Sequence, residues 1–163
     1  MIQEVKMVFG QEITLHTQGY SDVKNITGQV QEIIANSGIS AGVVNISVLG
    51  STASVSTIEY EPALVQDLQN VWEKWIPRPL QSLHSQTWGD DNGFSHIRAT
   101  FMGPGMTLPV VDGNVLRGTW QQIIVIDHDN RPRSRRVYIQ VMGEWEGRIV
   151  LQEAVMFSIV IPV

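Results

Sequence analysis

Two histidines and one acidic cluster are the side chains with the clearest capacity for chemistry. His84 lies in a stretch rich in Pro, Gly, Ser and Asp, His96 follows it, and Asp127-His128-Asp129 closes an apolar run. Two imidazoles and a carboxylate can hold a divalent metal, or can act as acid, base and anion-binding groups. The spacing of the two histidines matches no compact metal motif, so ordinary surface-loop and strand-capping histidines stay open as alternatives.

Four arginines form the one basic cluster of the sequence. They could hold a single small anion, and a solvated loop explains them equally well. Glu59 ends an apolar segment and is either functional or simply solvated. His16 is expected to be half-exposed, and Trp72 and Trp75 to be core or interface residues. The arginines of the cluster are Arg131, Arg133, Arg135 and Arg136.

The elements that must position these groups centre on residues 93–136, which we predict to be three strands joined by two turns. Polar and apolar residues alternate over 94–101, and this two-residue period is typical of a strand. The alternation places His96 on the same face as Arg98. His96 is therefore expected on a strand, at one end of the central sheet.

Turn and strand signals continue through the rest of this stretch. Gly and Pro at 103–105 and Asp-Gly at 112–113 can reverse the chain between strands. The run at 120–127 is apolar, rich in β-branched residues and too short for a typical helix, which predicts a buried strand. A further strand is expected at 137–142, followed by a turn at 143–147.

Two helices are predicted in the first half of the chain. Thr27 can cap the first, with Ile26 as a hydrophobic staple and Gly38 as its C-terminal stop. Pro62 can open the second, which prolines at 77 and 79 end. The apolar faces are Val30, Ile33 and Ile34 on the first helix, and Leu64, Leu68, Val71 and Trp75 on the second.

The remaining N-terminal segments are β-like. Strands at 1–9 and 12–17 are expected to form a hairpin through Gly10-Gln11, a pair suited to a tight turn. Further strands are predicted at 42–49 and 53–58. The stretch at 76–92, by contrast, has the composition of a loop that is long for a compact domain, and such loops are often functional.

This order of elements predicts the α+β class, with a mixed or antiparallel sheet layered against two helices in a single domain of residues 1–163. The length of 163 residues suits one domain with a hydrophobic core. Helices and strands do not alternate as they would in a parallel βαβ fold.

Charge and composition exclude several classes of partner. The net charge of −5 argues against a general affinity for nucleic acid or anionic lipid. The absence of Cys removes disulfide and thiol chemistry and fits a cytoplasmic protein. The start of the chain lacks the pattern of a signal peptide. The apolar C-terminal run AVMFSIVIPV is too short to span a bilayer and is expected, with residues 148–161, to form strands.

Eight short sequence blocks lie between residues 12 and 143. The blocks are HTQG at 16–19, IT at 26–27 with QVQE, STASVSTIE at 51–59, VQDL at 65–68, SHIRATFMG at 95–103, LPV at 108–110, GTWQ at 118–121 and SRR at 134–136. Together, and in this order, they resemble the YjbQ family of secondary thiamine-phosphate synthase-like proteins. The resemblance implies an α+β protomer in a homotrimer, with histidines, a glutamate and an arginine meeting near a subunit boundary.

The resemblance also implies roles for particular residues. His84 and His96 match family histidines and would be catalytic groups or ligands of a weakly bound zinc or magnesium ion. Glu59 matches a family glutamate, and Asp127 stands where a glutamate is usual; both would be catalytic. The substrate-binding residues would be Ser51, Thr52, Trp120 and Arg135, with Arg135 on a phosphate and Trp120 as a pocket wall.

One position departs from the family pattern: Gly50 occupies the place of a family histidine. Two imidazoles hold a divalent ion less firmly than three, so this change would weaken a metal site. Three functions follow as hypotheses. The first is a synthase that joins a pyrimidine pyrophosphate to a thiazole phosphate. The others are a non-enzymatic trimer that binds a small phosphorylated ligand, and a metal-dependent phosphate-ester hydrolase.

Overall fold

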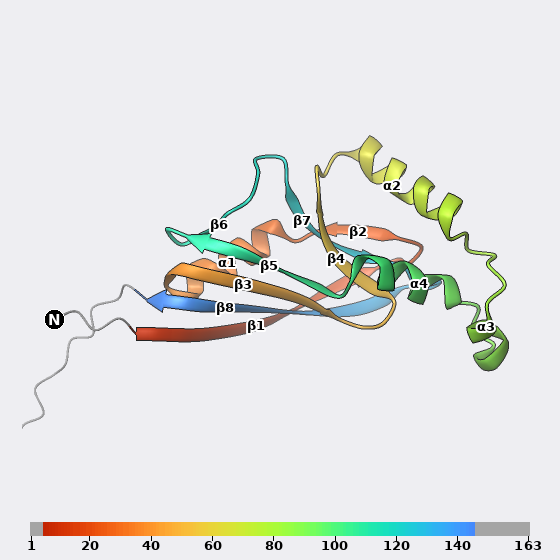
Figure 1. The fold of residues 1–163 in the computed structure, drawn as a ribbon, viewed down its shortest axis with the longest axis horizontal. Coiled ribbons are helices and arrows are strands. Elements are labelled where there is room, and N and C mark those ends of the chain that lie inside the picture. The colour runs from red at the N-terminus through yellow and green to blue at the C-terminus, as the bar shows by residue number, and fades with distance from the viewer. Residues whose placement is uncertain (1–4, 146–163) are drawn as a thin grey trace, which may run out of the picture.

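The structure is a computed structural model that describes residues 5–145, and within them the chain forms two antiparallel sheets and four helices (Figure 1). The α+β class expected from the sequence is confirmed, with antiparallel sheets and two more helices than expected. The strands expected at 148–161 lie outside the described residues. No helix of residues 5–145 is long and apolar enough to cross a membrane.

The larger sheet has five strands in the order β1-β8-β3-β5-β6. Strands β1 and β8 pair in unbroken antiparallel register, from Val5 opposite Trp145 to Thr17 opposite Arg133. Strand β8 also pairs with β3, so it lies inside the sheet. The strands are β1 Val5–Thr17, β3 Ile39–Leu49, β5 Gly105–Val111, β6 Asn114–Val115 and β8 Arg133–Trp145.

The smaller sheet has three strands in the order β2-β7-β4. These are β2 Asp22–Asn25, β4 Ala53–Ile58 and the central β7 Gln122–Asp127. Every residue of β7 after Gln122 is buried, because both faces of this sheet are covered. Burial on both faces explains why β7 is a continuous apolar run, and the strand predicted there is confirmed.

The helices are α1 Thr27–Ser37, α2 Pro62–Trp75, α3 Leu83–Trp88 and α4 Gly93–Met102. Helix α1 ends as expected, since Gly38 adopts the left-handed conformation and its N–H reaches the carbonyl of Ala35. Thr27 is not its cap, however. Thr27 is the first helical residue, and its N–H donates to the side-chain oxygen of Asn25 at 3.0 Å.

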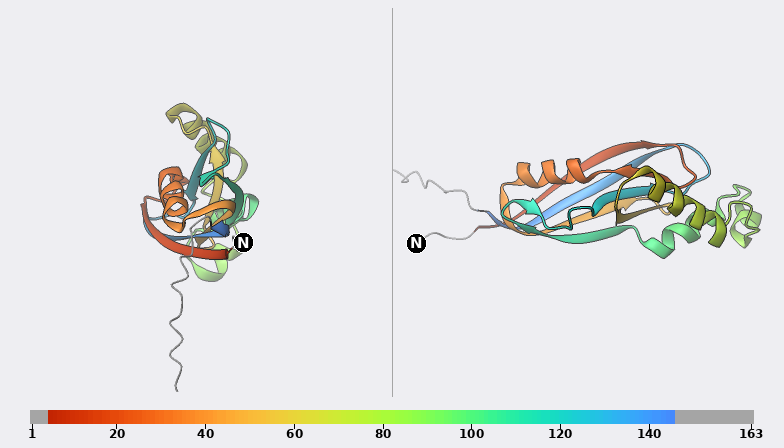
Figure 2. Two further views of the ribbon diagram at one scale, coloured as in Figure 1. Left: turned by 90° about the vertical axis from the view of Figure 1, so that its left-hand side faces the viewer. Right: turned by 90° about the horizontal axis from the view of Figure 1, so that it is seen from above.

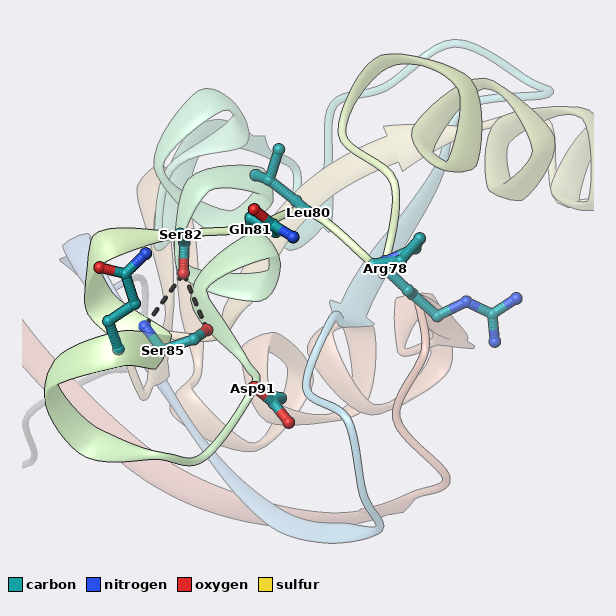
Figure 3. A pocket seen from close by; sticks show the side chains of 8 residues that line it. Arg78, Leu80, Gln81, Ser82, Ser85 and Asp91 are labelled. Carbon is teal, nitrogen blue, oxygen red and sulfur yellow. Dashed lines mark hydrogen bonds between the residues drawn. The ribbon is translucent and has the colours of Figure 1, made fainter.

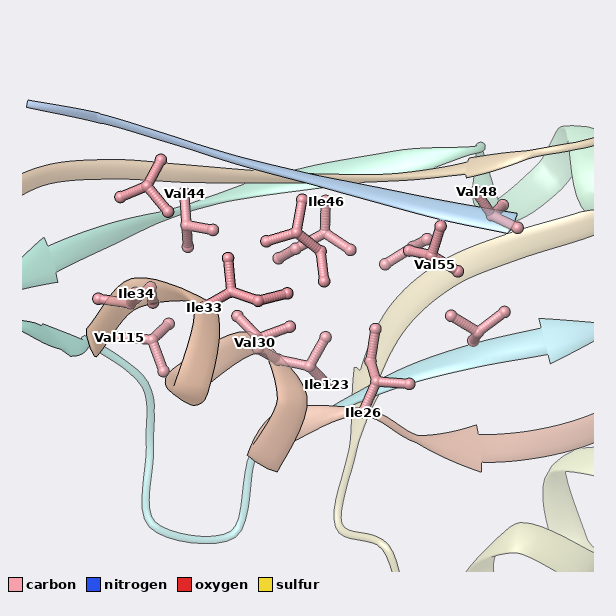
Figure 4. Close-up of a cluster of buried hydrophobic side chains, with 14 of the residues drawn as sticks. Ile26, Val30, Ile33, Ile34, Val44, Ile46, Val48, Val55, Val115 and Ile123 are labelled. Carbon is pink, nitrogen blue, oxygen red and sulfur yellow. The ribbon is translucent and has the colours of Figure 1, made fainter. Parts of the chain in front are cut away.

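The core lies between the larger sheet and a layer made of α1 and the smaller sheet (Figure 4). Val30, Ile33 and Ile34 of α1 point into it, facing Val44 and Ile46 of β3. The opposite face of the smaller sheet packs against α2 and α4. Figure 2 shows α2 lying outside the sheets. The fold therefore stacks three layers, and the middle one carries the buried β7.

Helix α2 begins as predicted, with Pro62 in its first turn, but its apolar stripe is largely uncovered. Leu64 and Val71 are each 37% exposed, and Trp75 is 70% exposed. The anchor is Trp72, which packs with Ile76 and Phe94 in a separate small cluster. Trp72 is thus a core residue, and α2 contacts the smaller sheet through Val65 and Leu68, at one edge of its apolar face.

Residues 93–102 form helix α4, so the strand predicted at 94–101 is wrong. Phe94, Ser95, Arg98 and Ala99 are buried, a pattern with helical rather than two-residue period. Arg98 explains the error. Its side chain is fully buried, and its charge is paired with Glu73 at 3.0 Å. Arginine is usually exposed, so nothing in the sequence indicated that position 98 lies on the buried face of a helix.

The hairpin predicted at Gly10-Gln11 is also wrong, because β1 runs straight through it. Gly10 lies opposite Gln140, and a Cβ atom there would lie 2.1 Å from the hydroxyl of Tyr138. Gly10 therefore makes room for a neighbouring aromatic ring and does not turn the chain. The turn at 143–147 is wrong for its described part, since β8 continues to Trp145. The turn at Asp112-Gly113 is confirmed between β5 and β6.

Candidate functional site

The His84 and His96 rings meet at one end of the molecule. Their centroids lie 4.6 Å apart and their planes are tilted by 57°. His84 comes from α3, inside the stretch expected to be a long loop, and His96 comes from α4. The two histidines thus converge as the length of that stretch suggested, although neither the short helix nor the helical setting of His96 was expected.

Hydrogen bonds at both ends fix α3 in place. Ser82 caps the helix by accepting from the backbone N–H of Ser85 at 3.1 Å. Gly89 closes it in the left-handed conformation, and its N–H donates to the Ser85 carbonyl at 2.7 Å. Just beyond, the side chain of Asn130 donates to the Asp90 carbonyl at 2.6 Å. His84 is therefore carried by a short helix with anchored ends.

The environment of His96 favours its neutral form. Burial lowers the pKa of His96, and the nearby His84 lowers it further, while Asp129, Asp90 and a backbone hydrogen bond of Ser51 act in the opposite direction. The net pKa lies below the ordinary value. A neutral imidazole can donate at one nitrogen and accept at the other, so His96 is suited to proton transfer or to hydrogen bonding with an anion.

Asp90 supplies a carboxylate next to His84. Its carboxylate lies 3.7 Å from Nε2 of His84, and the two side chains are about equally exposed. Asp90 was absent from the sequence-based candidates. The signal that could have found it is its place in the Asp-Asp pair after Gly89, between the two histidines in the chain.

Arg135 and Asp127 form a buried ion pair. Nε of Arg135 lies 2.9 Å from one oxygen of Asp127, and Nη2 lies 2.6 Å from the other. Nη2 also donates to Thr52 Oγ1 at 2.6 Å, and Thr17 donates to Asp127. Asp127 has no exposed surface, so the structure makes it the counter-ion that holds Arg135 and leaves it out of reach of a ligand.

Asp129 extends this network toward the histidines. Its carboxylate accepts from Arg133 at 2.6 Å and from Thr52 at 3.2 Å. Burial opposes its ionisation, but hydrogen bonds from the backbone of Asn130 and from Arg133 outweigh that effect and lower the pKa of Asp129. Asp129 is therefore a buried carboxylate that stays ionised at neutral pH.

The backbone of Gly50 lies against one nitrogen of Arg135. A Cβ atom built at Gly50 would lie 2.8 Å from Nη1 of Arg135. The other two guanidinium nitrogens are committed to Asp127 and Thr52, whereas Nη1 makes no hydrogen bond within the described residues. Because His96 contacts the backbone of Ser51, Nη1 and the imidazole flank the same turn of the chain.

Two residues that the resemblance placed in the site lie elsewhere. Glu59 follows the last residue of β4, and Trp120 lies two residues before β7, where Ile58 pairs with Gln122. The histidines are at the other end of β4, next to Ser51. Six strand residues separate the ends, roughly 20 Å. Within one chain, Trp120 cannot wall the site and Glu59 cannot orient either histidine.

A separate buried network surrounds His128. Nδ1 lies 2.9 Å from the Ser21 hydroxyl and Nε2 lies 3.0 Å from the Ser54 hydroxyl. Burial, with the nearby Arg98 adding to it, lowers the pKa of His128 to about 3. The ring has no exposed surface, so His128 is a neutral structural residue and the sequence candidate Asp127-His128-Asp129 divides into parts with different roles.

Comparison with known proteins identifies the family. The family model described as UPF0047 protein YjbQ-like matches residues 11–144. This chain belongs to the YjbQ family. A UPF0047 protein of Methanothermobacter thermautotrophicus is 33% identical over 137 residues, which cover 84% of this chain and 94% of that protein. The UPF0047 protein YjbQ of Escherichia coli O157:H7 is 27% identical over 107 residues, 65% of this chain and 77% of that protein.

Solved structures of similar proteins share the fold. A YbjQ-like protein of unknown function from Sulfolobus solfataricus P2 has a TM-score of 0.81 at 31% identity, over 86% of this chain and 100% of that one. A hypothetical protein from Aeropyrum pernix K1 has a TM-score of 0.77 at 29% identity, over 83% and 98%.

The donor set of this YjbQ chain fits a metal only in part. His84 and His96 supply two imidazoles, but residues 5–145 contain no group of three or more His, Cys, Asp or Glu side chains arranged to hold an ion. Catalytic zinc sites use three protein ligands. The residues of one chain therefore do not complete a zinc site, and any ion held by the two imidazoles would need outside ligands.

A cavity of about 600 Å³ is lined by residues 78–82 and by Ser85, Gln86 and Asp91 (Figure 3). Ser82 and Ser85 form one wall and share a hydrogen bond of 2.8 Å. The side chain of Arg78 points away from them (Figure 3), toward Glu73 and the ring of Tyr20. Neither histidine lines this cavity, so it is distinct from the histidine site of the YjbQ chain.

Proposed function

We propose that this YjbQ protein is a transferase of the thiamine-phosphate synthase kind, which joins a pyrimidine pyrophosphate to a thiazole phosphate. The observation that carries the proposal is the tilted contact of the His84 and His96 rings, 4.6 Å apart, near the turn at Gly50 and Ser51 against which Nη1 of Arg135 lies. This combination offers neutral and cationic donors to one anionic group.

The reaction makes modest demands on the protein. The thiazole nitrogen forms a bond to the pyrimidine methylene carbon while the bond from that carbon to the pyrophosphate oxygen breaks, and the electron pair leaves with pyrophosphate. The protein must orient two anionic substrates and stabilise the charge that grows on the leaving oxygens. Fixed hydrogen-bond donors in a partly desolvated site provide that stabilisation.

Each residue of the site has a role in this proposal. Nη1 of Arg135 binds a phosphate oxygen, while Asp127 and Thr52 hold the guanidinium in place. His96 donates a hydrogen bond to the leaving pyrophosphate, with His84 as its neighbour on the same anion. Ser51 is exposed next to His96 and can add a hydroxyl donor. A weakly held divalent ion on the two imidazoles would add positive charge at the same place.

The proposed assembly is a homotrimer. Because Glu59 and Trp120 lie at the far end of β4, they can approach the histidine pair only from a neighbouring chain. A head-to-tail contact between different surfaces closes into a ring when its rotation permits, and such a ring gives every site the same neighbour. The trimer thereby accounts for the separation of Glu59 from His96 within one chain.

A second candidate is a non-enzymatic protein that binds a small phosphorylated ligand. It is favoured by Gly50, which supplies no side chain where the family has a histidine, and by the open setting of the pair, with the His84 side chain 37% exposed. Such a protein would bind the same anions through Arg135 and the imidazoles but would not form thiamine phosphate. Metal-dependent hydrolysis is less favoured, because the described residues offer no third protein ligand.

The test is formation of thiamine phosphate by the purified protein from the two substrates. We expect turnover by the wild type and a loss of 100-fold or more in His96→Gln, the typical contribution of a positioned proton donor. His16→Gln is the matched control, since His16 is exposed on β1 and contacts Ser134. No product from the wild type supports the binding protein instead, and equal losses in both variants would remove the assignment to His96.

A further inference from the structure

We infer that Trp88 is the stacking platform for a planar heteroaromatic ring in the ligand of the His84 and His96 site. The inference rests on the proposed function, because it specifies the phosphorylated ligand as one that carries such a ring. Its structural basis is the exposure of Trp88, its position on α3 and the anchoring of that helix.

Packing does not account for Trp88. Helix α3 has no buried residue, and the Trp88 side chain is 72% exposed in the single chain. A tryptophan side chain carries a large apolar area and a single polar N–H, so it can cover the face of a flat ring. Leu83, at the start of the same helix, is 80% exposed and shows that α3 as a whole stands away from the core.

Helical geometry places Trp88 beside His84. The two residues are four apart in α3, so they lie on the same face of the helix one turn from each other. His84 in turn contacts His96, with 4.6 Å between ring centroids. Leu83 precedes His84 by one residue and therefore faces a different direction.

Hydrogen bonds at both ends of α3 hold Trp88 in a fixed position. The cap from Ser82 fixes the first turn of α3, and the closing hydrogen bond from Gly89 to Ser85 immediately follows Trp88. Asn130 then ties the next residue, Asp90, to the loop after β7. A tryptophan on a fixed turn loses little freedom when a ring stacks on it.

The resulting site divides the ligand into two parts. The imidazoles and Nη1 of Arg135 take the phosphate, and the indole of Trp88 takes a flat ring attached to it. Stacking on aromatic side chains tolerates different ring types, so the selected class is heteroaromatic phosphates over phosphates of open-chain alcohols. Trp120 cannot fill this place within one chain, because it lies at the far end of β4.

The experiment compares two probes by isothermal titration calorimetry: thiamine phosphate, which has rings, and inorganic pyrophosphate, which has none. For Trp88→Ala we expect thiamine phosphate affinity to fall roughly ten- to 100-fold, the loss of one aromatic stack. Pyrophosphate affinity should stay within about twofold. Trp88→Phe should keep most of the thiamine phosphate affinity, and Leu83→Ala, the control on the same helix, should match the wild type.

The outcomes separate this inference from the proposed function. If Trp88→Ala binds thiamine phosphate like the wild type, or loses both probes equally, the inference is overturned while pyrophosphate binding still supports the anion site. Wild-type protein that binds neither probe overturns both. Selective loss in Trp88→Ala without any turnover leaves the inference standing and removes the synthase. A changed sedimentation mass in Trp88→Ala with unchanged affinity would assign Trp88 to a protein interface and also overturn the inference.

Discussion

The imidazole rings of His84 and His96 are in contact, 4.6 Å between centroids, and His84 disfavours the charged form of His96. Burial is the main reason that the pKa of His96 is low, and His84 adds to it. His84→Asn should therefore raise the pKa of His96, though not to its ordinary value. Asp90→Asn should lower it further, because Asp90 favours the charged form. Nuclear magnetic resonance titration of the ring protons measures both, and shifts of the same sign would contradict the geometry.

The free energy of unfolding should decrease as the pH is lowered from 7 to 5, because His128 is buried in its neutral form. His128 has a pKa of about 3 in the folded protein and about 6.5 when unfolded, so the unfolded state binds the extra proton between these values. The stabilisation is complete above pH 6.5 and is lost as pH falls toward 3. Between pH 7 and 5 the free energy of unfolding should drop by about 2 kcal/mol. Urea titrations measure this drop, and His128→Gln should remove most of it; an equal slope in the variant would refute the assignment.

The Arg135–Asp127 pair should be structural, since both groups are buried and joined by two hydrogen bonds. Asp127→Asn leaves a buried guanidinium without its main counter-ion and should cost about 3 kcal/mol of unfolding free energy. Glu12→Gln is the control, because Glu12 makes the same two-point contact with Arg136 at the surface. Surface pairs are screened by water, so little change is expected there. Equal urea midpoints for Asp127→Asn and the wild type would show that the pair does not hold the site.

Zinc should bind weakly to the wild type and more tightly to Gly50→His. The new imidazole would be attached beside Ser51, whose backbone contacts His96, and would supply a third ligand. We expect a gain of at least tenfold, about 1.4 kcal/mol, in calorimetric titration. Gly50→Ala is the matched control, since it also places a Cβ against Nη1 of Arg135 without adding a ligand. Nanomolar, stoichiometric zinc binding by the wild type with no gain in Gly50→His would show that position 50 is not a vacated ligand site.

The protein should be a trimer in solution. Within the described residues, the aromatic side chains of Trp75, Phe101 and Trp120 are each at least 70% exposed, and burial between subunits would remove this apolar surface from water. Sedimentation equilibrium at micromolar concentrations should give three times the monomer mass. A monomer across that range would leave Glu59 and Trp120 with no route to the histidine pair, and their assignment to the site would fall.

The sequence by itself determined those helix ends, turns and strands that depend only on residues close together in the chain. The C-terminal stop of α1 at Gly38, the start of α2 at Pro62, the Asp112-Gly113 turn and the buried strand β7 all follow from backbone preferences and short-range apolar patterns. Family blocks distributed along the chain likewise identified the α+β fold. The length of the 76–92 stretch correctly indicated that His84 could reach His96.

Tertiary structure decided whatever depended on a partner distant in the sequence. The segment at 94–101 has the alternation of a strand but forms α4. Arg98 can lie on the buried face of this helix because Glu73 and the Ile76 carbonyl accept hydrogen bonds from its charged group. Gly10 serves Tyr138, which is brought opposite by the pairing of β1 with β8. Asp127 is a counter-ion because Arg135, on β8, lies next to it in the folded chain. Glu59 and His96 were separated by the straight length of β4, a distance that no residue type or spacing in the sequence expresses.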